Sequence, residues 1–217
     1  NLIRYNRALL QRNNLLKQFA ANNVFSLESL EVWDDQLVKY GQLIHEVRAV
    51  FIQKLQPIFQ KYYELISGGN EQVGLKLQSD LSDNDFEQVL KGSVGKDRAL
   101  QFTTTGIHKD DFEFELTGYP IRKFGSQGQK KTYLVALKLA QFDFMKEVSG
   151  LTPILLLDDI FDKLDKNRVE QIVKLVANDH FGQIFITDTN REHLDQMIES
   201  LETESRIFTI SDGNVVE

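Results

Sequence analysis

The stretch from Pro153 to Asp165, P-I-L-L-L-D-D-I-F-D-K-L-D, decides how the rest of the chain is organised. Its apolar run, Ile154 to Leu157, leads directly into two adjacent carboxylates, Asp158 and Asp159. A short continuous apolar run that opens with a proline is typical of a strand buried on both faces of a parallel sheet. Because ligands of open α/β sheets lie beyond the carboxyl ends of the strands, the carboxylates are expected where chemistry is usually placed.

The carboxylate pair suits a divalent cation. Two neighbouring carboxylates repel each other and stay ionised most easily beside a cation or in water. Mg²⁺ takes oxygen ligands and is usually held by one or two carboxylates together with substrate phosphates. The alternative is that Asp158 and Asp159 belong to a polar turn that caps a helix beginning near Lys166. The stretch favours the metal-binding interpretation over this one.

Composition sets the outer bounds. The chain has 217 residues, of which 41% are hydrophobic and 26% charged, enough to bury a core in one large or two small domains. No apolar run approaches the roughly 20 residues that a membrane span needs, so no membrane partner is expected. The chain has no cysteine, which excludes disulfide and thiolate chemistry within it and fits a reducing, cytoplasmic location.

The charge is unevenly distributed. Residues 1–61 carry eight Lys or Arg against five Asp or Glu, whereas the remainder carries seventeen against twenty-seven. A basic end on an acidic chain can mark a contact with a polyanion, although a solvated helical face is the alternative. The candidate cations of this basic end are Arg4, Arg7, Arg12 and Lys17.

Apolar periodicity predicts two domains. Apolar residues at three- and four-residue steps predict a helix over residues 1–22, and a near-heptad stripe predicts a longer helix from 28 to about 66. Such spacing indicates that the two helices pack as an antiparallel hairpin. A Ser-Gly-Gly-Asn stretch ends the second helix. We therefore predict a helical arm, residues 1–67, followed by an α/β lobe, residues 68–217.

The lobe should alternate strands and helices. The predicted strands are 73–77, 102–106, 112–116 with a hairpin return at 121–124, 154–157, 183–187 and 206–210. The predicted helices are 83–101, interrupted by glycines at 92–95, then 130–148, 166–177 and 191–200. Alternation of strand and helix is typical of a parallel α/β sheet, and we expect 154–157 and 183–187 to be its central, adjacent strands.

A second stretch suited to chemistry is F-G-S-Q-G-Q, which ends at Gln129 just before a predicted helix. Backbone N–H groups at a helix N-terminus point outward, and the helix dipole favours an anion there. Glycine lets the backbone approach a phosphate, and Ser126 could donate a hydroxyl hydrogen bond to it. The alternative is a glycine-containing loop that merely caps a helix. The carboxylate pair downstream makes the phosphate-binding interpretation the stronger one.

Together, G-S-Q-G-Q-K-K-T and the Pro153 stretch resemble the carboxyl half of an ABC-type ATPase head. Within that class the chain is similar to the RecF family of recombination mediators, which are related to SMC heads. Three further stretches carry the resemblance: Tyr5 to Lys17; Gly106 to Asp111, G-I-H-K-D-D, which resembles the family's G-P-H-R-D-D; and Phe185 to Thr189, F-I-T-D-T.

The resemblance implies roles for individual residues. The loop that would bind the γ-phosphate of ATP held by the opposite subunit consists of Gly125, Ser126, Gln127, Gly128 and Gln129. Asp158 would be the Walker B carboxylate that holds Mg²⁺, and Asp159 stands where many ABC ATPases carry the glutamate that orients the attacking water. Asp162 and Asp165 match the D-loop, which contacts the partner subunit. Asp188 stands where most ABC heads place a switch histidine.

For the intact protein, the resemblance implies a slow Mg-ATP hydrolase that forms an ATP-dependent homodimer on DNA. It would act in DNA repair, recombination and replication restart with recombination mediator proteins as partners, and the basic residues of the arm would contact DNA phosphates. The chain lacks G-x-x-x-x-G-K-[ST], so we expect a carboxyl-terminal fragment that is inactive alone. The alternatives are the head of another SMC-like ABC ATPase and a structural module that binds a partner.

Overall fold

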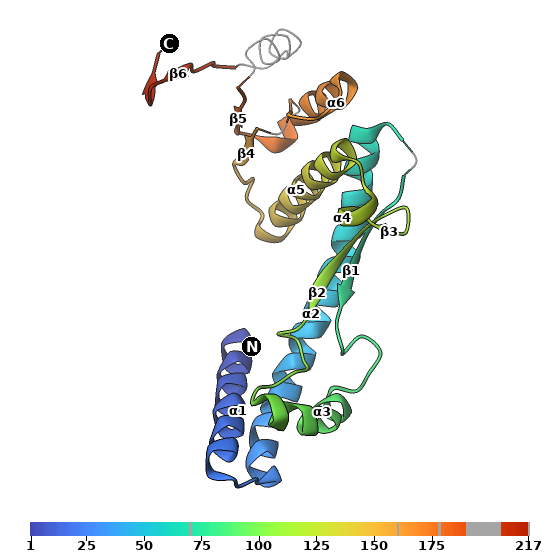
Figure 1. Ribbon diagram of the computed structural model, residues 1–217. Helices are drawn as coiled ribbons and strands as arrows, with labels where there is room; N and C mark the ends of the chain where they lie inside the picture. Colours follow the sequence, from blue (N-terminus) through green and yellow to red (C-terminus); the bar gives the residue numbers. More distant parts are fainter. Residues whose placement is uncertain (70, 160, 178, 190–204, 217) are drawn as a thin grey trace. The chain divides into compact units, whose positions relative to one another are not determined.

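The computed structural model describes residues 1–69, 71–159, 161–177, 179–189 and 205–216 (Figure 1). The chain divides into two compact units: unit 1 comprises Asn1–Pro57 and Gly74–Pro120, and unit 2 comprises Ile58–Val73 and Ile121–Glu217. These units are divided differently from the two predicted domains, because the long second helix belongs to both. That residues 1–67 act as a separate arm therefore stays a prediction.

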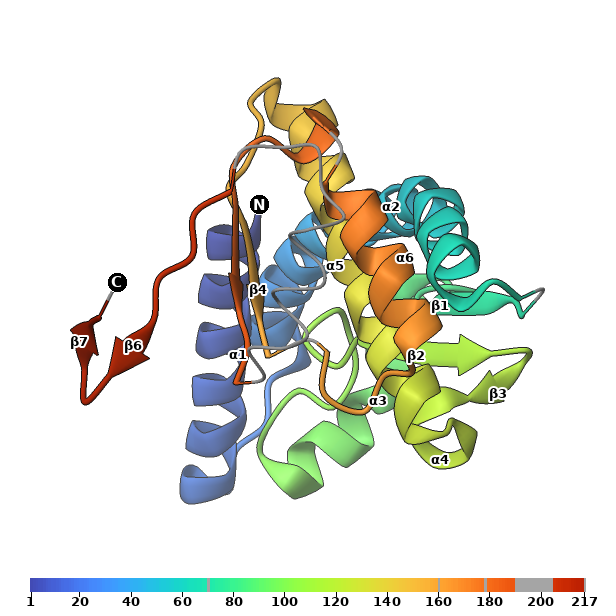
Figure 2. The same cartoon turned by 90° about the horizontal axis from the view of Figure 1, so that it is seen from above.

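The helical hairpin at the start of the chain is confirmed. Helix α1 (Leu2–Asn22) is followed by α2 (Leu27–Ser67), which continues through Pro57 without ending. Arg4 Nη1 donates to the Tyr40 hydroxyl at 3.2 Å, and Arg12 Nε donates to Asp34 at 2.5 Å. The residue number of the partner on α2 falls as the residue number on α1 rises, so the two helices are antiparallel. They lie side by side in Figures 1 and 2.

Helix α3 (Phe86–Leu100) completes the core of unit 1. The buried cluster joins α1, α2, α3 and two loops, and consists of Tyr5, Ala8, Leu37, Leu81, Phe86, Leu90 and Ile107. The predicted break at residues 92–95 is wrong, because α3 runs through both glycines and buries Ser93 and Asp97 on its inner face. The predicted strand at 102–106 is also wrong, because the Thr103 and Thr104 N–H groups donate to the Asn13 and Asp97 side chains instead.

A small sheet has the order β1 (Val73–Gln78), β2 (Asp111–Leu116) and β3 (Tyr119–Pro120). Strands β2 and β3 are antiparallel and joined by Thr117 and Gly118, both with positive φ, which is the geometry of a tight type I′ hairpin turn. The predicted return at 121–124 is wrong: the tight turn places the return at β3, and those residues form the short helix α4 (Ile121–Phe124).

Unit 2 carries the predicted parallel pair. Strands β4 (Leu155–Asp158) and β5 (Ile184–Thr187) pair in parallel and in register. The helices of this unit are α5 (Gln127–Ser149), α6 (Lys166–Val176) and the short 3₁₀ helix η1 (Asp179–Phe181). In Figures 1 and 2, α5 and α6 lie to one side of the strand pair. The adjacency and direction of the two predicted strands are confirmed.

The predicted burial of this strand on both faces is wrong for the described residues. Leu155 and Leu157 are buried, but Ile154 is 58% and Leu156 is 70% exposed. Burial alternates because the described sheet has two strands and is covered on one face.

The described residues near the end of the chain form a short β-hairpin. The predicted last strand at 206–210 is wrong, because only Ile210 of that range is in a strand. Instead, β6 (Ile210–Ser211) pairs with β7 (Asn214–Val215) as a short hairpin. The predicted helix at 191–200 lies outside the described residues. Among the described helices, none combines the length and apolar character needed to cross a bilayer.

Candidate nucleotide site

The two adjacent carboxylates leave the sheet at its carboxyl end, as predicted. In the β4–β5 register Asp158 lies opposite Thr187, and the Thr187 hydroxyl donates to Asp158 Oδ1. The Asp159 N–H donates to the Thr187 carbonyl at 3.2 Å and lies 3.3 Å from its hydroxyl oxygen. Thr187 therefore holds Asp158 through its side-chain hydroxyl and Asp159 mainly through its backbone carbonyl.

Asp159 adopts an unusual backbone conformation. Its φ is +46°, in the left-handed region that costs a non-glycine residue roughly 1–2 kcal/mol. Lys131, in the first turns of α5, donates from Nζ to the Asp159 carbonyl oxygen at 2.7 Å. The turn is thus held by Thr187 on one side and by Lys131 on the other. Sequence reasoning did not identify Lys131, since no pattern links it to a carbonyl 28 residues away.

The carboxylates fit a weakly coordinated divalent ion. Both Asp158 and Asp159 are exposed, and among the described residues no group of three or more His, Cys, Asp or Glu side chains could hold a metal ion. Mg²⁺ usually keeps several waters and takes one or two carboxylates plus phosphate oxygens. An exposed pair at a strand end meets that requirement, provided that a phosphate supplies the remaining ligands.

The glycine-containing loop forms a complete helix cap. Ser126 is the N-cap of α5: its hydroxyl accepts from the Gln129 N–H at 3.2 Å, and its own N–H donates to Gln129 Oε1 at 2.8 Å. This reciprocal capping box is the alternative that the sequence left open. It does not exclude an anion, because the Ser126 hydroxyl can still donate its hydrogen.

Close packing requires a glycine at position 125 and leaves little room for a side chain at position 128. A Cβ at Gly125 would lie 2.6 Å from Ile121 Cγ1 and 2.8 Å from the Ile121 carbonyl oxygen. A Cβ at Gly128 would lie 3.0 Å from Arg168 Nη1. The loop therefore sits tightly between α4 and the first turn of α6.

The remaining predicted residues lie around the start of α6. Asp165 caps this helix, accepting from the Arg168 N–H at 3.0 Å, and its carboxylate lies 3.3 Å from Arg168 Nε. Arg168 Nη1 also donates to the buried Thr132 hydroxyl at 3.2 Å, which joins α6 to α5. Asp162 makes a looser, exposed ion pair with Lys163 at 3.5 Å. Asp188 follows β5 directly, but its neighbour Thr187 makes the contact with Asp158.

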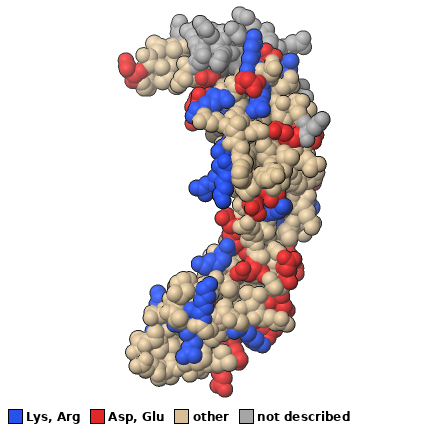
Figure 3. Space-filling view, turned by 45° about the vertical axis from the view of Figure 1, so that its right-hand side comes forward, with Lys and Arg blue, Asp and Glu red and all other residues tan. Residues whose placement is uncertain are grey.

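The structure divides the predicted basic residues of α1. Arg4, Arg7 and Lys17 are exposed, whereas Arg12 is completely buried and paired with Asp34 and Asp97. Including Arg12 in a phosphate-binding face was wrong, because its guanidinium is enclosed in the helical core. Figure 3 shows basic side chains interspersed with acidic ones on the face drawn.

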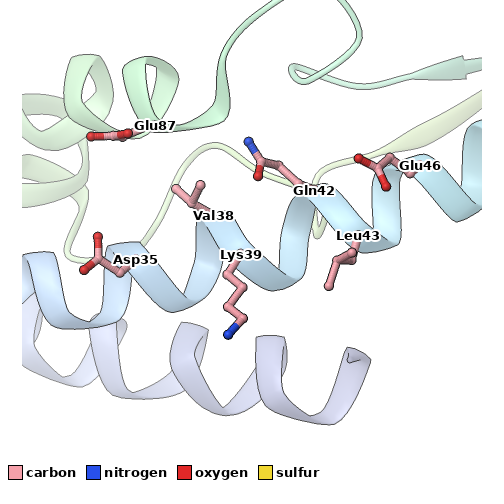
Figure 4. Close-up of a pocket in the computed structure, with 7 residues that line it drawn as sticks. All are labelled: Asp35, Val38, Lys39, Gln42, Leu43, Glu46 and Glu87. Atoms are coloured by element: carbon pink, nitrogen blue, oxygen red, sulfur yellow. The ribbon is translucent and has the colours of Figure 1, made fainter.

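A separate pocket of about 470 Å³ lies on α2 and α3. Figure 4 shows its lining residues, which are Asp35, Val38, Lys39, Gln42, Leu43, Glu46 and Glu87. None of the predicted site residues lines this pocket.

The described chain has an α/β fold with an antiparallel helical hairpin at its start. The two stretches that resemble the carboxyl half of an ABC-type ATPase head, the Ser126 loop and the Asp158–Asp159 turn, both lie in unit 2. No family model matches the chain. Over all 217 residues it is 51% identical to the DNA replication and repair protein RecF of Bacteroides thetaiotaomicron. It is 46% identical over 209 residues to the protein of the same name from Flavobacterium johnsoniae.

The chain is also similar to solved structures of RecF. A structure described as the recombination mediator protein RecF-ATP in the RecFOR pathway matches with a TM-score of 0.78 and 31% identity, over 99% of this chain and 57% of that one. The chain is therefore similar to RecF proteins over its whole length. It spans 58% of the length of these curated relatives.

Proposed function

We propose that the complete protein carrying this chain is an ATP-dependent DNA-binding protein whose heads dimerise around ATP. It would act in DNA repair, recombination and replication restart, with DNA and other recombination mediator proteins as partners. The observation that carries the proposal is the physical link between the two nucleotide-binding stretches. Lys131, which follows the Ser126 loop in helix α5, donates a hydrogen bond to the backbone of Asp159. Helix α5 is therefore directly connected to the turn that carries Asp158 and Asp159.

The carboxylate turn would serve the subunit's own nucleotide. Asp158, oriented by Thr187, would hold Mg²⁺, which supplies positive charge to the phosphates when bound. Asp159 would orient the attacking water. An aspartate is shorter than the glutamate of many ABC ATPases, which supports slow hydrolysis. The similarity to a solved structure described as RecF-ATP supports the choice of nucleotide.

The Ser126 loop would serve the nucleotide of the partner subunit. Its Ser126 hydroxyl and the backbone N–H groups that the capping box does not use lie at the N-terminus of the 23-residue helix α5, where the helix dipole favours an anion. These donors would neutralise charge on the γ-phosphate. The start of α6, with Asp162 and Asp165, would contact the partner, and Asp188 would stand at the switch position.

The test separates binding, dimerisation and hydrolysis in the complete protein. Asp159→Asn should bind ATP and dimerise but lose hydrolysis, while Ser126→Arg should bind ATP as a monomer and fail to dimerise. Light scattering with and without Mg-ATP, together with phosphate release, measures each step. Wild-type hydrolysis in Asp159→Asn would overturn the catalytic assignment. An oligomeric state indifferent to ATP would favour a structural module that binds a partner.

The isolated chain gives a complementary measurement. Because it lacks the G-x-x-x-x-G-K-[ST] loop, we propose that the 217 residues bind Mg-ATP weakly or not at all and hydrolyse none. Calorimetric titration with Mg-ATP tests this. Micromolar affinity would show that another loop of the chain replaces the missing one.

A further inference from the structure

We propose that Glu71 and Tyr63 position the Ser126 loop, and that Gln129 acts through Ser126 rather than by touching a phosphate. Gln129 Nε2 donates to Glu71 Oε1 at 2.6 Å, and the Tyr63 hydroxyl donates to Glu71 Oε2 at 2.8 Å. A continuous chain of hydrogen bonds therefore runs from the last turns of α2 through Glu71 to the N-cap of α5. This inference rests on the proposed function for its consequence, but not for its geometry.

The Gln129 side chain is fully engaged within the protein. Its oxygen accepts from the Ser126 N–H at 2.8 Å, and its nitrogen is directed at Glu71. The carboxylate of Glu71 fixes which way the amide points, because that carboxylate can accept but not donate. If the amide were reversed, its NH₂ group would face the Ser126 N–H and the capping box would be lost. Glu71 thus determines the orientation of the cap.

Tyr63 keeps the carboxylate of Glu71 in place. Its ring is completely buried and packs edge-on to Tyr133 of α5, with 6.3 Å between the ring centroids. Burial, and then the hydrogen bond to Glu71, raise the pKa of the Tyr63 hydroxyl well above its usual value, so this group remains a donor. Donation from a fixed hydroxyl leaves one Glu71 oxygen for Gln129.

The backbone beside Glu71 is anchored to the same helix. Gln60 Nε2 donates to the Glu71 carbonyl at 3.1 Å, and Gln60 Oε1 accepts from the Val73 N–H at 2.8 Å. The end of α2 therefore holds Glu71 through its main chain as well as through its side chain. A donor set aimed at a developing charge contributes most when it is held before the ligand arrives.

The first experiment needs no nucleotide. Amide hydrogen exchange of residues 126–130 in the complete protein reports how often the cap opens. Glu71→Ala and Gln129→Glu should each speed exchange by about tenfold, the second because it sets two carboxylates against each other. The double variant Glu71→Gln with Gln129→Glu should restore wild-type exchange within about threefold, because the amide and the carboxylate have merely changed places. Glu147→Ala, on the exposed side of α5, is the control.

The second experiment measures the consequence. In Glu71→Ala the complete protein should bind ATP as a monomer with wild-type affinity, while ATP-driven dimerisation weakens by about tenfold. Tyr63→Phe should have a smaller effect in the same direction. A wild-type protein that does not dimerise with ATP would reject the proposed function and leave the exchange result standing. Unchanged exchange in Glu71→Ala, failure of the double variant to restore it, or faster exchange with unaltered dimerisation would overturn the positioning role.

Discussion

Arg12 Nη1 lies 2.6 Å from Asp97 Oδ2, and both side chains are completely buried. The same guanidinium donates from Nε to Asp34 and from Nη1 to the Thr103 hydroxyl at 3.0 Å. One cation therefore joins α1, α2 and α3. Burial raises the pKa of the Asp34 carboxyl, and its contacts with Arg12 oppose that rise. The pairing is a condition for burying Asp97 at all, since an unpaired charge in a protein interior is costly.

Arg12→Ala should therefore destabilise the protein strongly. Removing one partner of a buried ion pair typically costs about 3–5 kcal/mol, because the remaining charge is left uncompensated. Urea unfolding of the chain measures the loss. Arg7→Ala, an exposed residue on the same helix, should stay within about 0.5 kcal/mol of wild type. Equal stability of the two variants would contradict the structural role of Arg12.

DNA binding should depend on the exposed cations of α1. Replacing Arg4, Arg7 and Lys17 by alanine in the complete protein should lower the salt dependence of duplex binding, by about 0.9 in log–log slope for each phosphate that is no longer neutralised. Titration of a labelled duplex at several salt concentrations gives that slope. Lys146→Ala serves as the control, because its Nζ donates to the His180 carbonyl at 2.6 Å in unit 2. An unchanged slope in the triple variant would remove α1 from the DNA-binding surface.

Acidification should weaken the structure around His108. Its Nε2 lies 3.1 Å from the Thr103 carbonyl and must carry the hydrogen, so Nδ1, 2.9 Å from the Tyr5 hydroxyl oxygen, accepts in the neutral form. Burial lowers the pKa of His108, and the Thr103 hydrogen bond partly offsets this. A histidine whose folded-state pKa is lowered contributes stability above its unfolded pKa of about 6.5, and that stability is lost as the pH falls below it.

The measurement compares unfolding free energies at pH 7.5 and pH 5.5. The loss on acidification should be smaller in His108→Gln than in wild type, because the titrating group has been removed. His180→Gln is the comparison variant, because that side chain is 44% exposed and contacts the Asp143 carboxylate instead of being enclosed as His108 is. The interpretation fails if both variants lose as much stability as wild type over this interval.

Local sequence patterns predicted the elements that depend on short-range information. The periodicity of residues 1–22 and 28–66 gave both helices of the hairpin to within about two residues, and the apolar runs gave the β4–β5 pair. The pattern could not tell which face of β4 is covered. An apolar residue such as Leu156 is suited to burial, but whether another element packs on it depends on segments that are distant in the sequence. The two exposed side chains, Ile154 and Leu156, are the consequence in the described residues.

Residue types and their spacing indicated the candidate site residues, but not the distant side chains that contact them. Adjacent carboxylates and a glycine-containing loop are visible in a sequence because their spacing is short. Arg12 looked like its exposed neighbours because nothing local distinguishes a cation that meets Asp97, 85 residues away. Glu71 and Lys131 were missed for the same reason, since each acts through a contact with a distant segment.

Lys131 should stabilise the left-handed turn at Asp159. Without its hydrogen bond to the Asp159 carbonyl, the turn keeps the contacts with Thr187 but loses a charge-assisted bond, which is worth about 1.5–3 kcal/mol where it is well formed. The bond is exposed, so we expect Lys131→Met to lose about 1 kcal/mol and to speed exchange of the Asp159 amide. Lys130→Met, one residue earlier on the same helix and exposed, is the control and should change neither.

Asp159→Gly completes the Lys131 test. Glycine adopts positive φ without the cost of a side chain, so this substitution should relieve the strain and make the Lys131 bond less important to stability. The destabilisation by Lys131→Met should therefore shrink in the Asp159→Gly background, as measured by a double-mutant cycle in urea. If the two effects simply add, the Lys131 hydrogen bond does not hold the backbone of Asp159 in its left-handed conformation.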